Sequence, residues 1–478
     1  MRLSKLLEGT GYRGVLAEDP EITGVSSNTA VLKPGELFVA LRGYKTDGHN
    51  YIPDAIAKGA GAILAEEGEG VLLVSDTRAA MATVCANWFG HPAREMTFIG
   101  VTGTNGKTTT TTLLWGLISR CLNTKVGLIG TNENRIGEEL LPAERTTPDI
   151  FELQKLLREM ADAGCTHVVM EVSSHALCLH RVDGIRFAVG AFSNLTQDHL
   201  DFHKTMEAYR EAKGRLFAQS DVSVLNLDDP AGQYYAKTVK NEVKTYGKGS
   251  KTLDLKAENV QLFAHGIQFD AISGHEKVAV KLPIPGDFSV YNALCTLSCA
   301  MALGIPLKAA SDYLATAHGV KGRMEVVPIP APGAVLIDYA HTPDALENAL
   351  KALRPNTSGR LFCLFGCGGD RDKTKRPIMG SIASGLADFC IITSDNPRTE
   401  EPNAIIENIL DGMKKDAPRL VEPDRPTAIR KALSLLGEGD VLLLAGKGHE
   451  TYQEVNGEKH HMDERELVRA CFPKAQEG

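Results

Sequence analysis

The residues with the clearest chemical meaning form one short run between an apolar segment and a helical one. Backbone N–H groups of a glycine-rich loop converge on anionic oxygens, and the helix that follows adds a partial positive charge. A lysine at the end of such a loop reaches the β- and γ-phosphates, and the next hydroxyl meets Mg²⁺. The run therefore predicts a nucleoside triphosphate site, although Val101, two residues before it, stands where the usual P-loop has Gly. Its residues are Gly103, Thr104, Asn105, Gly106, Lys107, Thr108 and Thr109.

A carboxylate and a histidine follow the next apolar strand, at 167–170, in the sequence Glu171-Val172-Ser173-Ser174-His175. Ligands of open α/β sheets gather at the carboxyl ends of the strands, so we expect this segment at the same edge as the phosphate loop. Mg²⁺ prefers oxygen ligands, which makes Glu171 a candidate metal ligand and His175 a second ligand or a phosphate contact. A strand-end carboxylate with a structural histidine is the alternative.

Charged residues gather in the loops that follow three strands near the C-terminus. These loops contain Arg371, then Asp395 and Arg398, then Glu450. Arginine binds carboxylates through two parallel hydrogen bonds, and Asp or Glu accepts from an ammonium group. The set therefore suits a zwitterion, and two arginines allow two carboxylates. Surface ion pairing is the alternative.

Three further positions leave alternatives open. Asp338 and His341 follow a strand and precede a helix, which fits either nucleotide contacts or a helix-cap network. Lys213 shares one face of a predicted helix with Tyr209 and Leu216. By spacing alone, an apolar stem with its ammonium in solvent is the simpler interpretation of Lys213.

Strand and helix patterns arrange these segments in an α/β fold of three domains. Residues 1–89 predict a small α/β module, residues 90–325 a central P-loop domain with a doubly wound, mostly parallel sheet, and residues 326–478 a Rossmann-like α/β domain. The expected strands are 36–41, 62–65, 71–74 and 96–101, strands ending near 172, 193 and 226, an antiparallel excursion at 255–285, and strands at 335–337, 361–365, 389–393 and 441–444; the expected helices are 52–58, 110–121, 209–217 and 290–303.

Composition is that of an ordinary globular protein, with 43% hydrophobic and 23% charged residues among 478. The net charge of −8 argues against nucleic-acid binding. We expect a cytoplasmic protein without membrane insertion, because the sequence lacks a signal-peptide core and any apolar run near the roughly 20 residues of a membrane span. The 10 cysteines are expected to be buried thiols, and Cys363 and Cys367 lack a second pair that would complete a zinc site.

Together these motifs resemble the Mur ligase family over essentially the whole chain, and its diaminopimelate-adding branch in particular. The resemblance implies an ATP-dependent ligase of peptidoglycan precursor synthesis, expected to be a monomer. It would add meso-diaminopimelate to UDP-N-acetylmuramoyl-L-alanyl-D-glutamate through an acyl phosphate and an amide bond. The segments that carry the resemblance are 103–109, 171–175, Tyr291-Asn292-Ala293, Gly322-Arg323-Met324-Glu325, Asp338-Tyr339-Ala340-His341-Thr342-Pro343-Asp344 and Asp395-Asn396-Pro397-Arg398.

The resemblance also assigns roles by position. Lys107, Lys213 and His341 are the expected catalytic residues, and Asn292, Arg323, Asp338 and His341 join the phosphate loop in binding ATP. Thr108, Glu171 and His175 would serve the Mg²⁺ sites. Lys213, as a carbamate formed from CO₂, would supply oxygens to a second Mg²⁺. Ser27, Thr146, Thr147, Ser173 and Arg181 would hold the UDP substrate, and Arg371, Asp395, Asn396, Pro397, Arg398, Gly446 and Glu450 the added amino acid.

Arg398 gives a physical reason to expect diaminopimelate rather than lysine. It can pair with the distal carboxylate that lysine lacks, and it would repel the lysine ammonium. Two positions depart from the pattern of some relatives, at Tyr44 in the sugar-nucleotide loop and at Leu179. The alternatives are a lysine-adding ligase, a ligase like folylpolyglutamate synthetase, and a non-catalytic nucleotide-binding regulatory module.

Overall fold

The structure is a computed structural model that describes residues 1–14, 18–43, 46–249, 252–263, 266–317, 319–330 and 333–472. Tyr44 lies outside the described residues. The chain forms two compact units, and α4, β10, α8 and β11 contribute residues to both. Unit 1 contains Met1–Thr102, Leu122–Gly190 and Ala212–Val222, and unit 2 contains Gly103–Cys121, Ala191–Glu211 and Ser223–Gly478.

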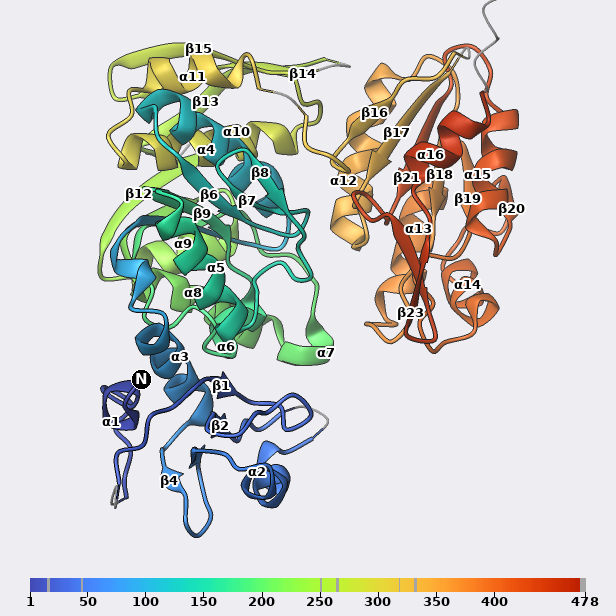
Figure 1. Ribbon diagram of the computed structural model, residues 1–478. Coiled ribbons are helices and arrows are strands. Elements are labelled where there is room, and N and C mark those ends of the chain that lie inside the picture. The colour runs from blue at the N-terminus through green and yellow to red at the C-terminus, as the bar shows by residue number, and fades with distance from the viewer. Residues whose placement is uncertain are drawn as a thin grey trace, which may run out of the picture. The chain divides into compact units, whose positions relative to one another are not determined.

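Unit 1 begins with a small parallel sheet, the N-terminal sheet, whose order over the described residues is β1-β2-β3-β4 (Figure 1). Side chains alternate across it: Leu37 and Val39 pack with α1 and α3, whereas Phe38 packs with Ala55 of α2. The strands expected at 36–41, 62–65 and 71–74 and the helix at 52–58 are confirmed. The elements are α1 Leu3–Leu6, β1 Val25–Ser26, β2 Leu37–Val39, η1 Gly48–Tyr51, α2 Ile52–Ala57, β3 Ala62–Ala65, β4 Leu72–Leu73 and α3 Thr77–Trp88.

The central sheet has the order β15-β14-β13-β12-β11-β10-β5-β9-β6-β7-β8, eleven strands within the described part of the chain. In unit 1, β9 pairs in parallel with both β5 and β6, and a short antiparallel extension, β7 and β8, follows. Buried, parallel, apolar strands need helices on both faces of the sheet, and this is the doubly wound arrangement predicted for the central domain. The elements of this part are η2 Pro92–Arg94, β5 Thr97–Thr102, β6 Val126–Ile129, β7 Asn134–Ile136, β8 Glu139–Leu141, α5 Ile150–Asp162, β9 His167–Glu171, α6 Ser174–Cys178 and β10 Phe187–Phe192.

The unit 2 part of the central sheet contains the expected antiparallel excursion, since β13, β14 and β15 form an antiparallel meander. Helix α10 lies against β12 and β13, and α11 lies against β15. Helix α4 begins at Lys107 rather than near Thr110, because the lysine already belongs to its first turn. The elements are α4 Lys107–Leu122, α7 Leu200–His203, α8 Met206–Ala218, β11 Ser220–Asn226, α9 Pro230–Thr238, β12 Glu242–Gly247, β13 Leu255–Phe263, β14 Gly266–Ser273, β15 Glu276–Leu282, α10 Phe288–Ala302 and α11 Leu307–Leu314.

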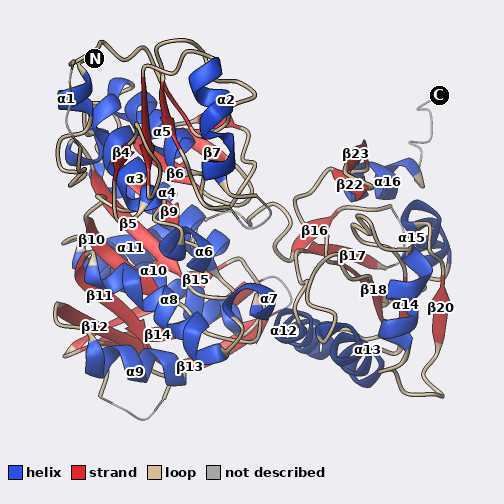
Figure 2. Cartoon of the chain, turned by 90° about the horizontal axis from the view of Figure 1, so that it is seen from below, coloured by secondary structure: helices blue, strands red, loops and turns tan. Residues whose placement is uncertain are grey.

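The C-terminal sheet, with the order β16-β17-β21-β18-β19-β20 over the described residues, is parallel except at β16. Cys363 faces α12 and α13, whereas Phe362 and Leu364 face α15 and α16, so helices cover both faces (Figure 2). The four strands expected here are confirmed. The elements are β16 Glu325–Val327, β17 Ala334–Asp338, α12 Pro343–Leu353, η3 Arg354–Asn356, β18 Leu361–Phe365, α13 Lys375–Leu386, β19 Phe389–Ile392, α14 Pro402–Leu410, β20 Arg419–Val421, α15 Arg425–Ser434, β21 Val441–Ala445, β22 Tyr452–Val455, β23 Glu458–His461 and α16 Glu464–Ala470.

Within the part of the chain that the structure describes, none of the helices has both the length and the apolar character needed to cross a bilayer. The cysteines are free thiols, and most are buried, as expected from their apolar surroundings.

Candidate active site

The phosphate loop, residues 103–106, joins the end of β5 to the start of α4. Gly103 and Gly106 adopt φ values of 149° and 86°, which other residues rarely reach. Space is equally restricted: a Cβ atom on Gly103 would lie 1.9 Å from Ser193 Oγ, and one on Gly106 would lie 2.4 Å from Asn292 Oδ1. Both glycines are therefore required here, and α10 brings Asn292 against the loop.

Polar groups at the end of β10 brace the loop from the side. Ser193 Oγ donates to the Asn105 carbonyl at 2.6 Å, and the Asn194 carbonyl accepts from Thr104 N at 2.8 Å. Asn194 Oδ1 also accepts from Asn105 N at 2.9 Å. We did not predict Ser193 and Asn194 as site residues; their position after an apolar strand of the same sheet was the available signal.

Lys107 and Thr108 point toward polar partners of the same unit. The Lys107 ammonium donates to the carbonyl oxygens of Gly103 and Thr104, each at 2.9 Å, and so lies over the loop. Thr108 Oγ1 accepts from Arg323 Nη2 at 2.9 Å, and the Arg323 guanidinium lies 4.8 Å from the centre of the Tyr339 ring. The structure thus brings Arg323 to the start of α4.

Asp338 is the last residue of β17, and His341 follows the strand. Burial raises the pKa of Asp338, whose carboxylate accepts from Met324 N at 2.7 Å. His341 Nδ1 lies 2.8 Å from the Tyr339 carbonyl, which can only accept, so Nδ1 carries the proton. Burial, assisted by the Lys375 ammonium, lowers the pKa of His341 to about 4, and its ring is neutral at pH 7. The cap of α12 is Thr342, not Asp338 or His341, which removes the helix-cap alternative for these two side chains.

Glu171 ends β9 in unit 1, in register with Val101 on β5. It is 1% exposed, and both carboxylate oxygens accept from Thr131, at 2.8 Å from the backbone N and 3.0 Å from Oγ1. The Thr131 Oγ1 atom also lies 3.0 Å from Thr146 Oγ1, whose hydroxyl can donate to it. A buried carboxylate with hydroxyl neighbours is an oxygen-donor group of the kind that Mg²⁺ accepts.

Thr147 and Ser173 lie beside Glu171. Thr147 Oγ1 donates to the Glu171 carbonyl at 2.8 Å and accepts from Ser173 N at 3.1 Å. Ser173 caps the short helix α6, which carries the half-buried His175. The structure therefore brings Thr146, Thr147, Ser173 and Glu171 together.

Lys213 is 1% exposed on α8. A snorkelling lysine would keep its ammonium in solvent, so the interpretation from spacing alone is wrong. Among the described residues, no group of three or more His, Cys, Asp or Glu side chains has an arrangement that could hold a metal ion. The role of Lys213 stays a prediction from the resemblance.

A cavity of about 420 Å³ lies in unit 1 between the N-terminal sheet and the start of α5. Ser27, Leu179 and Arg181 line it together with Arg78. Arg181 donates to the Thr147 carbonyl at 2.9 Å and pairs with Asp149 at 2.7 Å. The cavity thus joins Ser27 and Arg181, both expected to bind the UDP substrate, to the cluster around Thr147.

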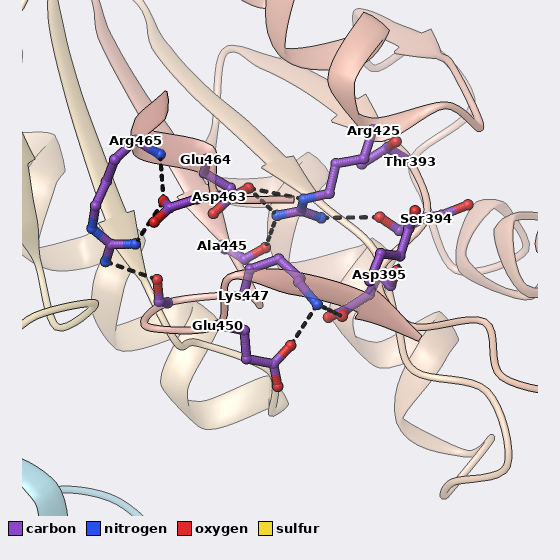
Figure 3. A network of polar contacts seen from close by, with 12 residues as sticks. Thr393, Ser394, Asp395, Arg425, Ala445, Lys447, Glu450, Asp463, Glu464 and Arg465 are labelled. Carbon is purple, nitrogen blue, oxygen red and sulfur yellow. Dashed lines mark hydrogen bonds and ion pairs between the residues drawn. The ribbon is translucent and has the colours of Figure 1, made fainter. Parts of the chain in front are cut away.

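The loops after β18, β19 and β21 converge at the edge of the C-terminal sheet, as predicted. The fully buried Lys447 pairs with Glu450 at 2.5 Å and with Asp395 at 3.7 Å (Figure 3). Asn396 bridges them, because its amide donates to Glu450 at 2.9 Å and accepts from Lys447 at 2.7 Å. Burial raises the pKa of Glu450, with Asp395 acting in the same direction and Lys447 against it. A Cβ atom on Gly446 would lie 2.8 Å from Asp395 Oδ2.

The two predicted arginines differ in their surroundings. Arg371 is exposed, whereas Arg398 is held in a left-handed conformation with φ 52° and contacts Glu454 and the Gly369 carbonyl. Both lie around Gly368: a Cβ atom there would be 3.0 Å from Arg398 Nη1 and 3.7 Å from Arg371 Cγ. A Cβ atom on Gly369 would lie 1.9 Å from the Pro397 carbonyl oxygen, so the backbone of Pro397 leaves room only for glycine there.

A second buried ion pair ties two of these loops together (Figure 3). Arg425 and Glu464 are both 0% exposed, and Arg425 Nε lies 2.9 Å from Glu464 Oε1. Arg425 also donates to the carbonyls of Ser394 at 3.2 Å and Ala445 at 2.8 Å. We did not predict Arg425, Glu464 or Lys447, because a charged residue in a polar stretch shows no sign of burial in the sequence.

Three family models match consecutive segments of this chain. The Mur ligase family, catalytic domain, matches residues 21–89, the Mur ligase middle domain matches 101–300, and the Mur ligase, glutamate ligase domain, matches 322–448.

Known proteins match the chain over nearly its full length. A UDP-N-acetylmuramoyl-L-alanyl-D-glutamate–2,6-diaminopimelate ligase of Clostridium botulinum is 44% identical, covering 98% of this chain and 99% of the relative. One of Caldanaerobacter subterraneus is 44% identical over 100% of both. A solved structure with the same ligase name has a TM-score of 0.68 and 34% identity, and covers 96% of each chain. The chain belongs to the Mur ligase family.

Proposed function

We propose that this protein joins 2,6-diaminopimelate to UDP-N-acetylmuramoyl-L-alanyl-D-glutamate at the expense of ATP, in the synthesis of peptidoglycan precursors. The observation that carries the proposal is the 44% identity, over essentially the whole length, to ligases named for this reaction. The buried Asp395–Asn396–Lys447–Glu450 cluster beside Arg398 supports it, because it offers both carboxylates and a guanidinium to a zwitterion.

The reaction has two chemical steps. The γ-carboxylate of the D-Glu residue attacks the γ-phosphorus of ATP, and the bond to ADP breaks, giving an acyl phosphate. The amine of diaminopimelate then attacks the acyl carbon, loses a proton, and expels inorganic phosphate, giving an amide. Both steps build negative charge on oxygen, so positively charged and N–H groups are the main catalytic requirement.

Residues of unit 2 serve the nucleotide in this proposal. The glycine loop, with Lys107, Thr108 and Thr109, would hold the phosphates, and Asn292, Arg323 and Asp338 would contact the rest of ATP. His341 would contribute as a neutral ring, because burial lowers its pKa to about 4. Lys107 would exchange its two loop carbonyls for phosphate oxygens.

Mg²⁺ would neutralise the charge that develops on the transferred phosphoryl group. We propose that Thr108, Glu171 and His175 serve the Mg²⁺ sites, and that Lys213 serves a second Mg²⁺. Lys213 would act as a carbamate, which supplies oxygens where an ammonium would repel the ion. Intact-protein mass spectrometry at neutral pH tests this: we expect a gain of one CO₂ that is absent in Lys213→Ala.

The substrates would bind at the two clusters described above. Ser27, Thr146, Thr147, Ser173 and Arg181 would hold the UDP substrate, and Arg371, Asp395, Asn396, Pro397, Arg398, Gly446 and Glu450 the amino acid. We accordingly propose domains at residues 1–89, 90–325 and 326–478 for the UDP substrate, ATP and the amino acid. We also propose that the protein acts as a monomer in the cytoplasm.

Measurement of phosphate release tests this function. With ATP, Mg²⁺ and the UDP-dipeptide substrate, we expect release only when diaminopimelate is also present, together with a UDP-tripeptide product. Equal or faster release with L-lysine would favour the lysine-adding alternative. Release with tetrahydrofolate and glutamate instead would favour a ligase like folylpolyglutamate synthetase. ATP binding without turnover of any acceptor would point to the regulatory alternative.

A further inference from the structure

The loop that carries Arg398 rests on the hairpin formed by β22 and β23. Gln453 Nε2 donates to the Asp395 carbonyl at 2.6 Å, and Glu454 N donates to Asn396 Oδ1 at 2.9 Å. Arg398 N donates to the Glu454 carbonyl at 3.1 Å. These bonds hold Asp395, Asn396 and Arg398, three residues of the proposed amino-acid site. The hairpin therefore supports the loop that carries them.

The Arg398 side chain is held by the same hairpin. Its Nε donates to Glu454 Oε2 at 3.1 Å, and its Nη1 donates to the Gly369 carbonyl at 2.8 Å. A guanidinium has five N–H groups in a rigid planar fork and can present either of two edges to a carboxylate. Glu454 occupies Nε and the Gly369 carbonyl takes one of the two N–H groups of Nη1. The second Nη1 N–H and the Nη2 group beside it form the edge that remains for a bidentate ligand.

We infer that Glu454 is a positioning residue for amino-acid selection: it selects the edge of the Arg398 guanidinium that meets the distal carboxylate of diaminopimelate. The inference rests on the proposed function. Arg398 and Glu454 side chains are 21% and 27% exposed, so the pair lies at the surface of the site and remains accessible to a ligand.

Two roles of Glu454 make opposite predictions. If its carboxylate only neutralised Arg398, removing it would strengthen the attraction for a ligand carboxylate and lower the KM for diaminopimelate. If it orients Arg398, removing it frees the side chain to adopt other rotamers and raises that KM. The second outcome is the one expected, because the Nε bond and the φ of 52° together define one arrangement.

The test compares steady-state kinetics of the full-length protein and its variants. For Glu454→Ala we expect the KM for diaminopimelate to rise about 10-fold or more, the loss expected for one charge-assisted hydrogen bond. The KM values for ATP and the UDP substrate should stay within about two-fold. Glu454→Gln keeps an accepting oxygen, so its KM for diaminopimelate should lie between those of the unmodified protein and Glu454→Ala. Glu458→Gln, on the other strand of the hairpin, removes the same charge from an exposed site and should behave like the unmodified protein.

A double-mutant cycle separates orientation from general support. In an Arg398→Ala background, Glu454→Gln should add less than about two-fold, because the residue it positions is gone. An unchanged or lower KM in both Glu454 variants, or a full additional loss in the Arg398→Ala background, would overturn the inference. If the unmodified protein itself did not use diaminopimelate, the proposed function would fail instead.

Discussion

Replacing Arg425 by methionine is expected to destabilise the part of the protein built on the C-terminal sheet. Methionine has a similar length and packs well, but it cannot hydrogen bond. The substitution leaves the Glu464 carboxylate buried without its cation, and it leaves the Ser394 and Ala445 carbonyls without the donors that now lie 3.2 and 2.8 Å away. Both members of the pair are fully buried, so solvent cannot take the place of the guanidinium.

The magnitude follows from these losses. Removing one partner of a buried ion pair costs about 3–5 kcal/mol. In a folding unit of roughly 150–250 residues, each kcal/mol lowers the melting temperature by about 2–4 °C. We therefore expect the first melting transition of Arg425→Met to fall by on the order of 10 °C.

Differential scanning calorimetry of the purified protein measures this shift. The double variant with Glu464→Met as well should melt above Arg425→Met, because it no longer buries an unpaired charge. Arg425 also contacts the loops of the proposed amino-acid site, so in Arg425→Met the KM for diaminopimelate should rise more than the KM for ATP. If Arg425→Met melted within about 2 °C of the unmodified protein, the reasoning would be refuted.

Three other predictions concern individual side chains. Lys107→Met should reduce ATP-dependent phosphate release by about 100-fold or more, because the γ-phosphate loses its cation; a smaller loss would place the nucleotide elsewhere. Arg398→Ala should reduce kcat/KM for diaminopimelate while ATP binding, measured by calorimetry, stays unchanged; unaltered diaminopimelate kinetics would contradict its role. The Arg376 guanidinium lowers the pKa of Glu400 to about 2, so this pair stabilises the fold above the ordinary glutamate pKa and the contribution disappears as the pH falls toward 2. The melting temperature of Glu400→Gln should therefore fall less between about pH 5 and pH 2 than that of the unmodified protein. An equal fall in both proteins would contradict the assignment.

Apolar periodicity predicted most of the secondary structure in the phosphate-binding and C-terminal segments. β18 and β21 are uninterrupted apolar runs bounded by Gly and polar residues, and such runs form buried parallel strands. Helix α3 was not predicted, because its first turn contains Thr77 and Arg78 and its apolar residues are mainly small. Local patterns also could not place β7 and β8, which are three residues each.

The candidate site was predictable where chemistry is carried by a contiguous motif. Gly103 to Thr109 and Asp395 to Arg398 are of this kind. Ser193, Arg425 and Glu454 were not found, because their importance depends on contacts with residues 20 or more positions away. Lys213 shows the same limit: its burial comes from the packing of α8 and not from the residues next to it in sequence.

The central claim is selection of diaminopimelate by a ligase with the Arg398 loop. A competition assay tests it most directly. The protein is incubated with ATP, Mg²⁺, UDP-N-acetylmuramoyl-L-alanyl-D-glutamate and equal concentrations of meso-diaminopimelate and L-lysine, and the products are identified by mass spectrometry. We predict a UDP-tripeptide that contains diaminopimelate almost exclusively; a product that contains mainly lysine would contradict the account.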